Sequence, residues 1–156
     1  MPLADDLLEQ CYHLAQKDTG TPMQASLRRA LSTAYYALFH LLIEEAVNAW
    51  AVERQRSILA RTFDHGRMRA ICDGVLRTGK VGSAVPPQLM LVAQSFIVLQ
   101  DIRHTADYDN ARVWSRTDVL DVLDAARDAF DAWRAIRSDD AAQDFLLDLF
   151  LPKRAR

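Results

Sequence analysis

The chain has 156 residues, of which 50% are hydrophobic and 26% are charged. This length and balance predict a single globular domain over residues 1–156 and exclude a disordered or fibrous chain. The formal net charge of −2, with both signs interspersed, excludes a bulk electrostatic attraction to nucleic acid. Any contact with RNA would therefore need a local basic patch, and the tail residues Lys153, Arg154 and Arg156 form one.

Features at the N-terminus and along the chain predict a cytoplasmic protein that makes no membrane contact. The first ten residues are acidic from Asp5 onward and lack both the basic region and the small-residue cleavage site of a signal peptide. The uncharged run Ala30–Ile43 contains serine, threonine, tyrosine and histidine and is too short to span a bilayer. Cys11 and Cys72 lie far apart within helical patterns, which favours packed, reduced thiols over a disulfide.

Hydrophobic periodicity and capping signals predict an all-α chain of five or six helices. The first helix is expected over Leu3–Lys17, and the second continues to about Ala51. Thr21 is the expected N-cap of that second helix, with Pro22 at its first position and Gln24 closing a capping box. Its buried stripe is predicted to consist of Leu27, Leu31, Ala34, Tyr35, Leu38, Leu42 and Ala46.

The second half of the chain continues the helical pattern. A helix over Glu53–Arg77 is expected to be interrupted at Asp64–Gly66, where Asp64 can cap a restart. A loop follows over Thr78–Pro87, and Ser115 is the expected cap of a later helix. The remaining helices are predicted over Pro87–Tyr108, Thr117–Ile136 and Asp139–Leu149. Long helices joined mostly by short loops favour an antiparallel up-and-down bundle.

Two of these helices carry polar lines on otherwise apolar surfaces. At about 100° per residue, the second helix places Arg29, Ser32, Tyr36 and His40 within a narrow sector. The helix over Pro87–Tyr108 places further polar residues on one face, and the two faces are expected to meet. The residues of this second line are Gln100, Arg103, His104 and Asp107.

The histidine and cysteine spacings of the chain do not match a metal site. HxxxH, CxxC and HExxH are all missing, and so are the glycine-rich signatures GxGxxG and GxxxxGK[ST]. The sequence therefore predicts neither a bound metal nor a nucleotide cofactor held by a glycine-rich loop. No cofactor is expected.

Three segments, in the same order along the chain, resemble the HEPN family, specifically its bacterial branch of small stand-alone proteins. The first is Ser26–Leu42, SLRRALSTAYYALFHLL, which is similar to a helix with paired arginines, a double tyrosine and a following histidine. The second is Asp64–Arg67, DHGR, with Gly79 beyond it. The third is Gln100–Asp109, QDIRHTADYD, which is similar to an Arg-x-x-Ala-Asp-Tyr signature.

The resemblance implies a helical bundle that usually forms a homodimer, with the motif helices of two protomers lining a shared cleft. Active members cleave RNA without metal through an Arg and a following His that are separated by four to six intervening residues. Here that spacing from Arg103 falls on Tyr108, Asp109 and Asn110. His104 adjoins Arg103 instead, about 100° round the helix.

Two functions follow from the resemblance. In the first, the chain is a dimeric module that binds nucleotide or RNA, or supports assembly, without cutting RNA, and its cleft residues are Arg29, Tyr36, His40, His65, Asp107 and Tyr108. In the alternative, it is a metal-independent endoribonuclease, the toxin half of a toxin–antitoxin pair whose partner is a minimal nucleotidyltransferase. Arg103 and His104 are then the expected catalytic pair, and His40 or His65 are the other possible sources of the imidazole.

Two structural expectations complete the interpretation. A homodimer is expected also because the second helix carries more apolar and aromatic surface than one stripe buries within a monomer. That surface consists of Tyr35, Tyr36, Phe39, Leu41 and Ile43. In addition, Arg103 and Asp107 are expected to be partly buried in a polar cleft, with Arg29 or His40 close by.

Overall fold

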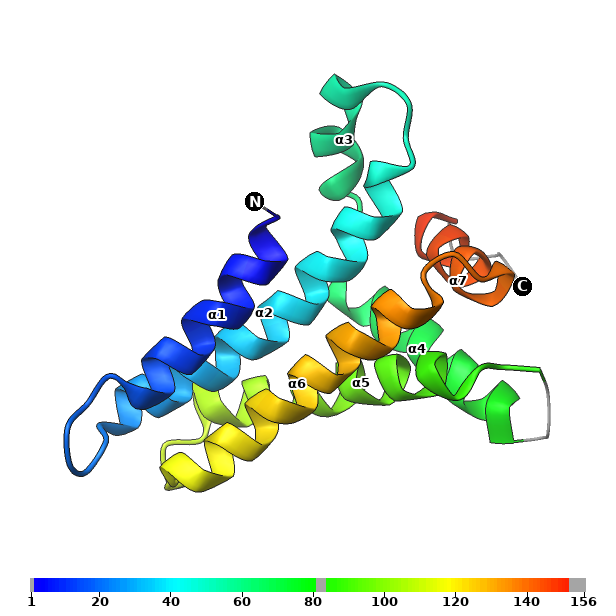
Figure 1. Ribbon diagram of the computed structural model, residues 1–156. Helices are drawn as coiled ribbons and strands as arrows, with labels where there is room; N and C mark the ends of the chain where they lie inside the picture. The colour runs from blue at the N-terminus through cyan, green and yellow to red at the C-terminus, as the bar shows by residue number, and fades with distance from the viewer. Residues whose placement is uncertain (1, 81–83, 152–156) are drawn as a thin grey trace.

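A computed structural model describes residues 2–80 and 84–151, and all the regular secondary structure within them is α-helical (Figure 1). The predicted basic patch of Lys153, Arg154 and Arg156 lies outside the described residues. The helices are α1 (Leu3–Gln16), α2 (Gln24–Asn48), α3 (Glu53–Ala60), α4 (His65–Lys80), α5 (Pro87–Tyr108), α6 (Arg116–Ile136) and α7 (Asp140–Phe150). The predicted all-α fold class is confirmed.

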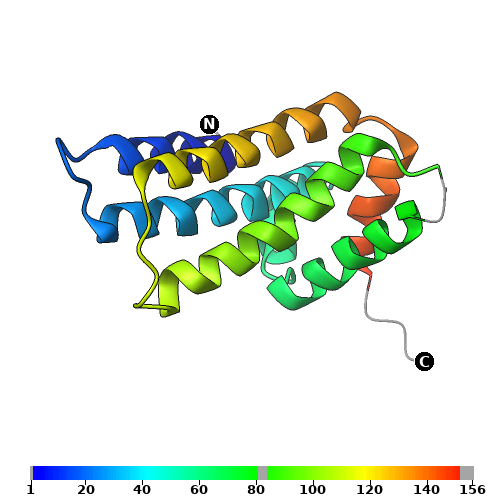
Figure 2. The same ribbon diagram turned by 90° about the horizontal axis from the view of Figure 1, so that it is seen from below.

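The long helices form an antiparallel bundle around α2. This helix packs against α1, α5 and α6 and also contacts α3 and α7, while α4 lies against α5 and α7. Figure 2 shows that neighbours in the chain run in opposite directions, α1 against α2 and α5 against α6. No described helix combines the length and the apolar character that crossing a membrane requires.

The capping box predicted at the start of the second helix is wrong. Helix α2 begins at Gln24, and Met23 precedes it without a side-chain cap. The carboxylate of Asp18 accepts a hydrogen bond from the Met23 backbone N–H at 3.0 Å. The Gln24 amide instead makes two hydrogen bonds of 2.8 Å with the backbone of Trp114. Because its side chain is used in this tertiary contact, Gln24 does not complete a capping box.

The break around residue 62 separates two helices rather than bending one, which is why the described residues contain seven helices instead of five or six. Asp64 caps the restart as predicted, because its Oδ1 accepts from the Arg67 backbone N–H at 2.9 Å. Helix α4 extends into the segment predicted as a loop and ends at Lys80. The predicted Ser115 cap is confirmed, since its Oγ accepts from the Asp118 N–H at 3.1 Å.

The core follows the predicted stripe of α2 and extends beyond it. Every residue of that stripe is buried, and the largest fully buried side chains elsewhere are Phe96, Phe130 and Trp133. Phe39, Leu41 and Ile43 are buried as well, because α2 is surrounded by its neighbours within one chain. The apolar surplus on which the expected homodimer partly rested is therefore covered by the monomer itself, with only Tyr36 left half-buried.

Both cysteines are buried free thiols, as predicted. Burial raises the pKa of Cys11 and of Cys72 to about 12, so both remain protonated and unreactive near neutral pH. They contribute to packing and not to a reactive centre.

Candidate functional site

Arg103 lies near the C-terminal end of α5, where that helix packs against α2. Its Nη1 donates a hydrogen bond to the Tyr36 hydroxyl at 3.1 Å and lies 3.5 Å from an oxygen of Asp107. The side chains of Arg103 and Asp107 are 20% and 24% exposed, which agrees with the expected partial burial. The guanidinium also lies 5.3 Å from the ring centre of Tyr35 and 5.5 Å from that of Tyr36, within the range of cation–π attraction.

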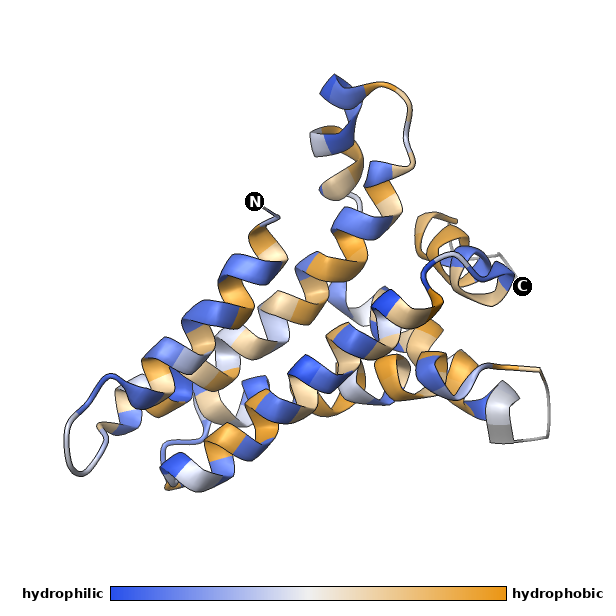
Figure 3. Cartoon of the chain, viewed as in Figure 1, coloured by the Kyte–Doolittle hydropathy of each residue, from blue (hydrophilic) through white to orange (hydrophobic). Residues whose placement is uncertain are grey.

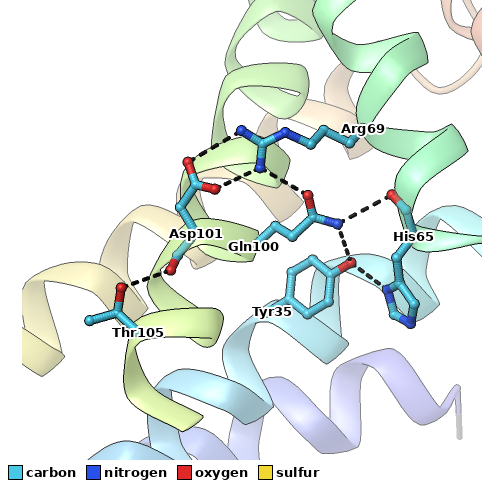
Figure 4. Close-up of polar contacts among 6 residues, drawn as sticks. All are labelled: Tyr35, His65, Arg69, Gln100, Asp101 and Thr105. Carbon is cyan, nitrogen blue, oxygen red and sulfur yellow. Dashed lines mark hydrogen bonds and ion pairs between the residues drawn. The ribbon is translucent and has the colours of Figure 1, made fainter. Parts of the chain in front are cut away.

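A hydrogen-bond network beside this arginine joins α2, α4 and α5 (Figure 4). Arg69 donates to Gln100 Oε1 at 3.0 Å and is paired with Asp101 at 2.6 Å. The amide nitrogen of Gln100 donates to the Tyr35 hydroxyl at 3.3 Å and to the backbone carbonyl of His65 at 3.2 Å. The Tyr35 hydroxyl lies 2.6 Å from His65 Nδ1.

This network fixes the tautomer of His65. A guanidinium only donates hydrogen bonds, so Arg69 orients the oxygen of Gln100 toward itself and the amide nitrogen toward Tyr35. The Tyr35 hydroxyl accepts from that nitrogen and keeps its own hydrogen for His65 Nδ1. Burial raises the pKa of Tyr35 to about 12, so the hydroxyl stays a donor near neutral pH. The neutral imidazole of His65 then carries its proton on Nε2.

The surroundings of His65 favour this neutral form. Its ring stacks on Phe39 at 4.2 Å between centres and meets the Tyr36 ring edge-on at 6.0 Å. Burial lowers the pKa of His65, and the positive charge of Arg103 lowers it further. The imidazole of His65 and the guanidinium of Arg103 thus each lie within 6.0 Å of both tyrosine rings.

A groove of about 490 Å³ between α1 and α2 continues the site away from Arg103. The polar line predicted on α2 forms one of its walls: Arg29, Ser32, Tyr36 and His40 all line it. Tyr36 belongs to both places, because its hydroxyl binds Arg103 while its side chain lines the groove. Burial lowers the pKa of His40, and the neighbouring His65 lowers it further. The apolar residues of the groove are Leu3, Leu7 and Leu14 of α1.

Six of the eight predicted site residues separate into two groups. Tyr36, His65 and Asp107 gather around Arg103, and Arg29 and His40 share the groove beside Tyr36. The other two residues lie apart. His104 is exposed, and its ring contacts Tyr108 at 5.0 Å between centres.

Sequence reasoning did not assign roles to several residues that organise this region. Arg28 is the less exposed of the paired arginines Arg28 and Arg29. It donates to the backbone carbonyls of Ala106 and Arg112 at 2.8 and 2.7 Å, which ties the end of α5 and the segment after it to α2. Arg69 and Gln100 set the orientation of Tyr35. Gln100 shares the helix face of Arg103, but nothing in the local pattern around Arg69 indicated its partner 32 residues away.

Within the described ranges, no group of three or more histidine, cysteine or acidic residues could hold a metal ion. What the site offers chemically is a half-buried guanidinium, a phenol, and imidazoles whose pKa values are lowered by burial. We found no match to this chain among protein-family models, curated proteins or solved structures.

Proposed function

We propose that the chain is a HEPN-like module that binds the phosphate groups of RNA or of a nucleotide at Arg103. The observation that carries this proposal is that residues from three separate segments meet at one site. Tyr36, His65 and Arg103 come from the three separate segments that resemble the family, and they lie together around one guanidinium. Segments distant in sequence that share one polar site are the arrangement expected of a binding surface on a rigid scaffold.

The chemistry of the site suits an anionic ligand. A guanidinium binds phosphate oxygens through paired hydrogen bonds, and Arg103 uses only part of its capacity within the chain. Its contact with Asp107 is a long one, at 3.5 Å, and the side chain remains 20% exposed. The adjoining groove adds Arg29 and His40, which extends the site along a ligand longer than one phosphate.

The partners implied by the resemblance belong to this proposal. A homodimer would bring two copies of the Arg103 surface into a shared cleft, and a minimal nucleotidyltransferase would be the companion in a toxin–antitoxin pair. Light scattering at micromolar concentration tests the first, because a monomer has a mass of 17.7 kDa. Growth arrest on expression of the chain alone, relieved by the companion, tests the second.

Binding of a fluorescently labelled single-stranded RNA tests the central proposal. Arg103→Ala should weaken the affinity about tenfold or more, since charge-assisted hydrogen bonds to phosphate are lost. Arg127→Ala is the matched control, because it removes the same charge from the exposed face of α6, where the guanidinium stacks on Tyr12. Equal affinities of the two variants would refute the assignment of the site to Arg103.

A second candidate function, metal-independent RNA cleavage, is favoured by the position of His65. In this proposal His65 of α4 provides the imidazole that the family spacing does not provide on α5, and the charge of Arg103 is near enough to lower the pKa of His65. Cleavage should then resist chelators and fall about 100-fold or more in His65→Ala, while His104→Ala stays near the wild-type rate. Activity that follows His104 and ignores His65 would contradict this assignment.

A further inference from the structure

Helix α3 and the turn before it form an exposed projection, residues 50–61, called here the α3 arm. No residue of α3 is buried, and Figure 1 shows the helix standing away from the long helices of the bundle. Three large apolar side chains of the arm are exposed: Trp50 by 47%, Val52 by 41% and Ile58 by 61%. Such a concentration of apolar surface on a projecting element is typical of a contact site.

The α3 arm is held in a defined shape. The indole N–H of Trp50 donates to Gln55 Oε1 at 2.8 Å, and Arg56 Nε donates to the Trp50 carbonyl at 2.9 Å. A partner would therefore meet a preorganised surface and lose little conformational entropy in ordering it. Arg54 and Arg61 are exposed and take part in none of the ion pairs formed by the described residues.

A groove with complementary chemistry lies between α4 and α7 on the same molecule. It measures about 1160 Å³, and we call it the acidic groove. Ile71, Val75 and Phe145 contribute its apolar lining. Its carboxylates come from Asp64, Asp144 and Asp148, all of which are exposed.

The charges of the two surfaces match. The arm carries Arg54, Arg56 and Arg61 against Glu53, which gives 3 − 1 = +2. The acidic groove carries three aspartates against Arg67, which gives 1 − 3 = −2. Asp144 and Asp148, like Arg54 and Arg61, form no ion pair with any described residue.

We propose that the α3 arm of one copy docks into the acidic groove of a second copy. Ile58 and Trp50 would meet the apolar lining, and Arg54 and Arg61 would face Asp144 and Asp148. The apolar side chains favour a protein partner over a nucleic acid, because a phosphate backbone offers Val52 and Ile58 nothing to pack against. This contact uses residues separate from the Arg103 site and stands independently of RNA binding.

Charge reversal on each side tests the docking by light scattering over a range of concentrations. Arg54→Glu with Arg61→Glu, and separately Asp144→Arg with Asp148→Arg, should each weaken self-association at least about tenfold, because like charges then face one another. An equimolar mixture of the two variants should associate again, since each reversed arm meets a reversed groove. Asp128→Arg with Asp131→Arg, which makes the same charge change on the exposed face of α6, should leave self-association unchanged.

Three results would overturn the proposal. The wild-type chain could keep a mass of 17.7 kDa at all concentrations, or the two variants could fail to associate when mixed while circular dichroism shows both folded. Alternatively, reversal of the arm could abolish binding of labelled RNA and leave the mass of the protein unaffected. That last result would make the arm a nucleic-acid contact.

Discussion

Tyr35 and Tyr36 are neighbours on α2, yet they belong to two different regions of the molecule. Tyr35 is fully buried, and its hydroxyl links His65 to Gln100 in a network that ends in the Arg69–Asp101 pair. Tyr36 is half-buried: its hydroxyl accepts a hydrogen bond from Arg103, and its side chain lines the groove between α1 and α2. Figure 3 shows hydrophilic and hydrophobic segments alternating along the helices.

One tyrosine organises the fold, while the other holds the guanidinium that we propose as the ligand-binding group. Around Tyr35, donors and acceptors are matched within the chain, so removing one leaves another without a partner. Around Arg103, the hydrogen-bonding capacity is only partly used. Changes at Tyr35 should therefore affect stability, and changes around Arg103 should affect binding more than stability.

The largest effect is expected at Tyr35. Tyr35→Ala should lower the free energy of unfolding by about 3–5 kcal/mol, the range for removing a large aromatic side chain from a core. Tyr35→Phe keeps the ring and should cost about 1–3 kcal/mol, because His65 Nδ1 loses its partner and the Gln100 amide nitrogen loses one of its two acceptors. Tyr36→Phe, the matched control, should cost less than Tyr35→Phe. Equal costs in urea unfolding would remove the distinction between the two regions.

A smaller effect is expected at Asp107. Its contact with Arg103 is 3.5 Å long and partly exposed, and Arg103 keeps its hydrogen bond to Tyr36 when the carboxylate is removed. Asp107→Ala should therefore cost about 1 kcal/mol or less, the range for an exposed ion pair within one helix. A loss of 3–5 kcal/mol, typical of stranding a buried charge, would show that the guanidinium depends on this carboxylate.

The smallest effect is expected from pH. Burial and the Arg103 charge lower the pKa of His65, so the unfolded chain binds a proton that the folded chain resists. The folded state should lose stability as the pH falls from about 7 to about 5, through the ordinary range of histidine. His40 acts in the same direction, and Glu44, whose pKa is raised by burial, opposes both.

Unfolding midpoints measured across this pH range check the effect of His65. His65→Gln removes the titrating group and should flatten the dependence relative to wild type. His104→Gln exchanges an exposed histidine and serves as the control. If His65→Gln kept the wild-type dependence of the unfolding midpoint on pH, protonation of His65 would not contribute to that dependence.

Parts of this arrangement could be predicted from sequence because they depend on helical periodicity. The 100° step between Tyr35 and Tyr36 places the first in the apolar stripe and the second in the polar line, and both positions are observed. The meeting of the Tyr36 and Arg103 faces follows from the same periodicity and from antiparallel packing.

Other features depend on tertiary contacts that no local pattern records. Gln24 lost its predicted capping role to Trp114, 90 residues away. His65 lies at the start of α4, after the interruption that the sequence predicts, but the local pattern did not show that α3 would project from the bundle. The expectation that α2 carries more apolar surface than a monomer can bury failed for a related reason. The pattern alone did not show how many helices would surround α2.

The salt dependence of RNA binding tests the central claim most directly. Each phosphate contact made by a cation releases counterions, so the logarithm of the affinity falls linearly with the logarithm of salt concentration. If Arg103 contacts one phosphate of a single-stranded RNA, Arg103→Gln should reduce the magnitude of that slope by about 0.7, while Arg127→Gln leaves it at the wild-type value. An unchanged slope in Arg103→Gln would contradict the assignment of Arg103 as the phosphate-binding residue.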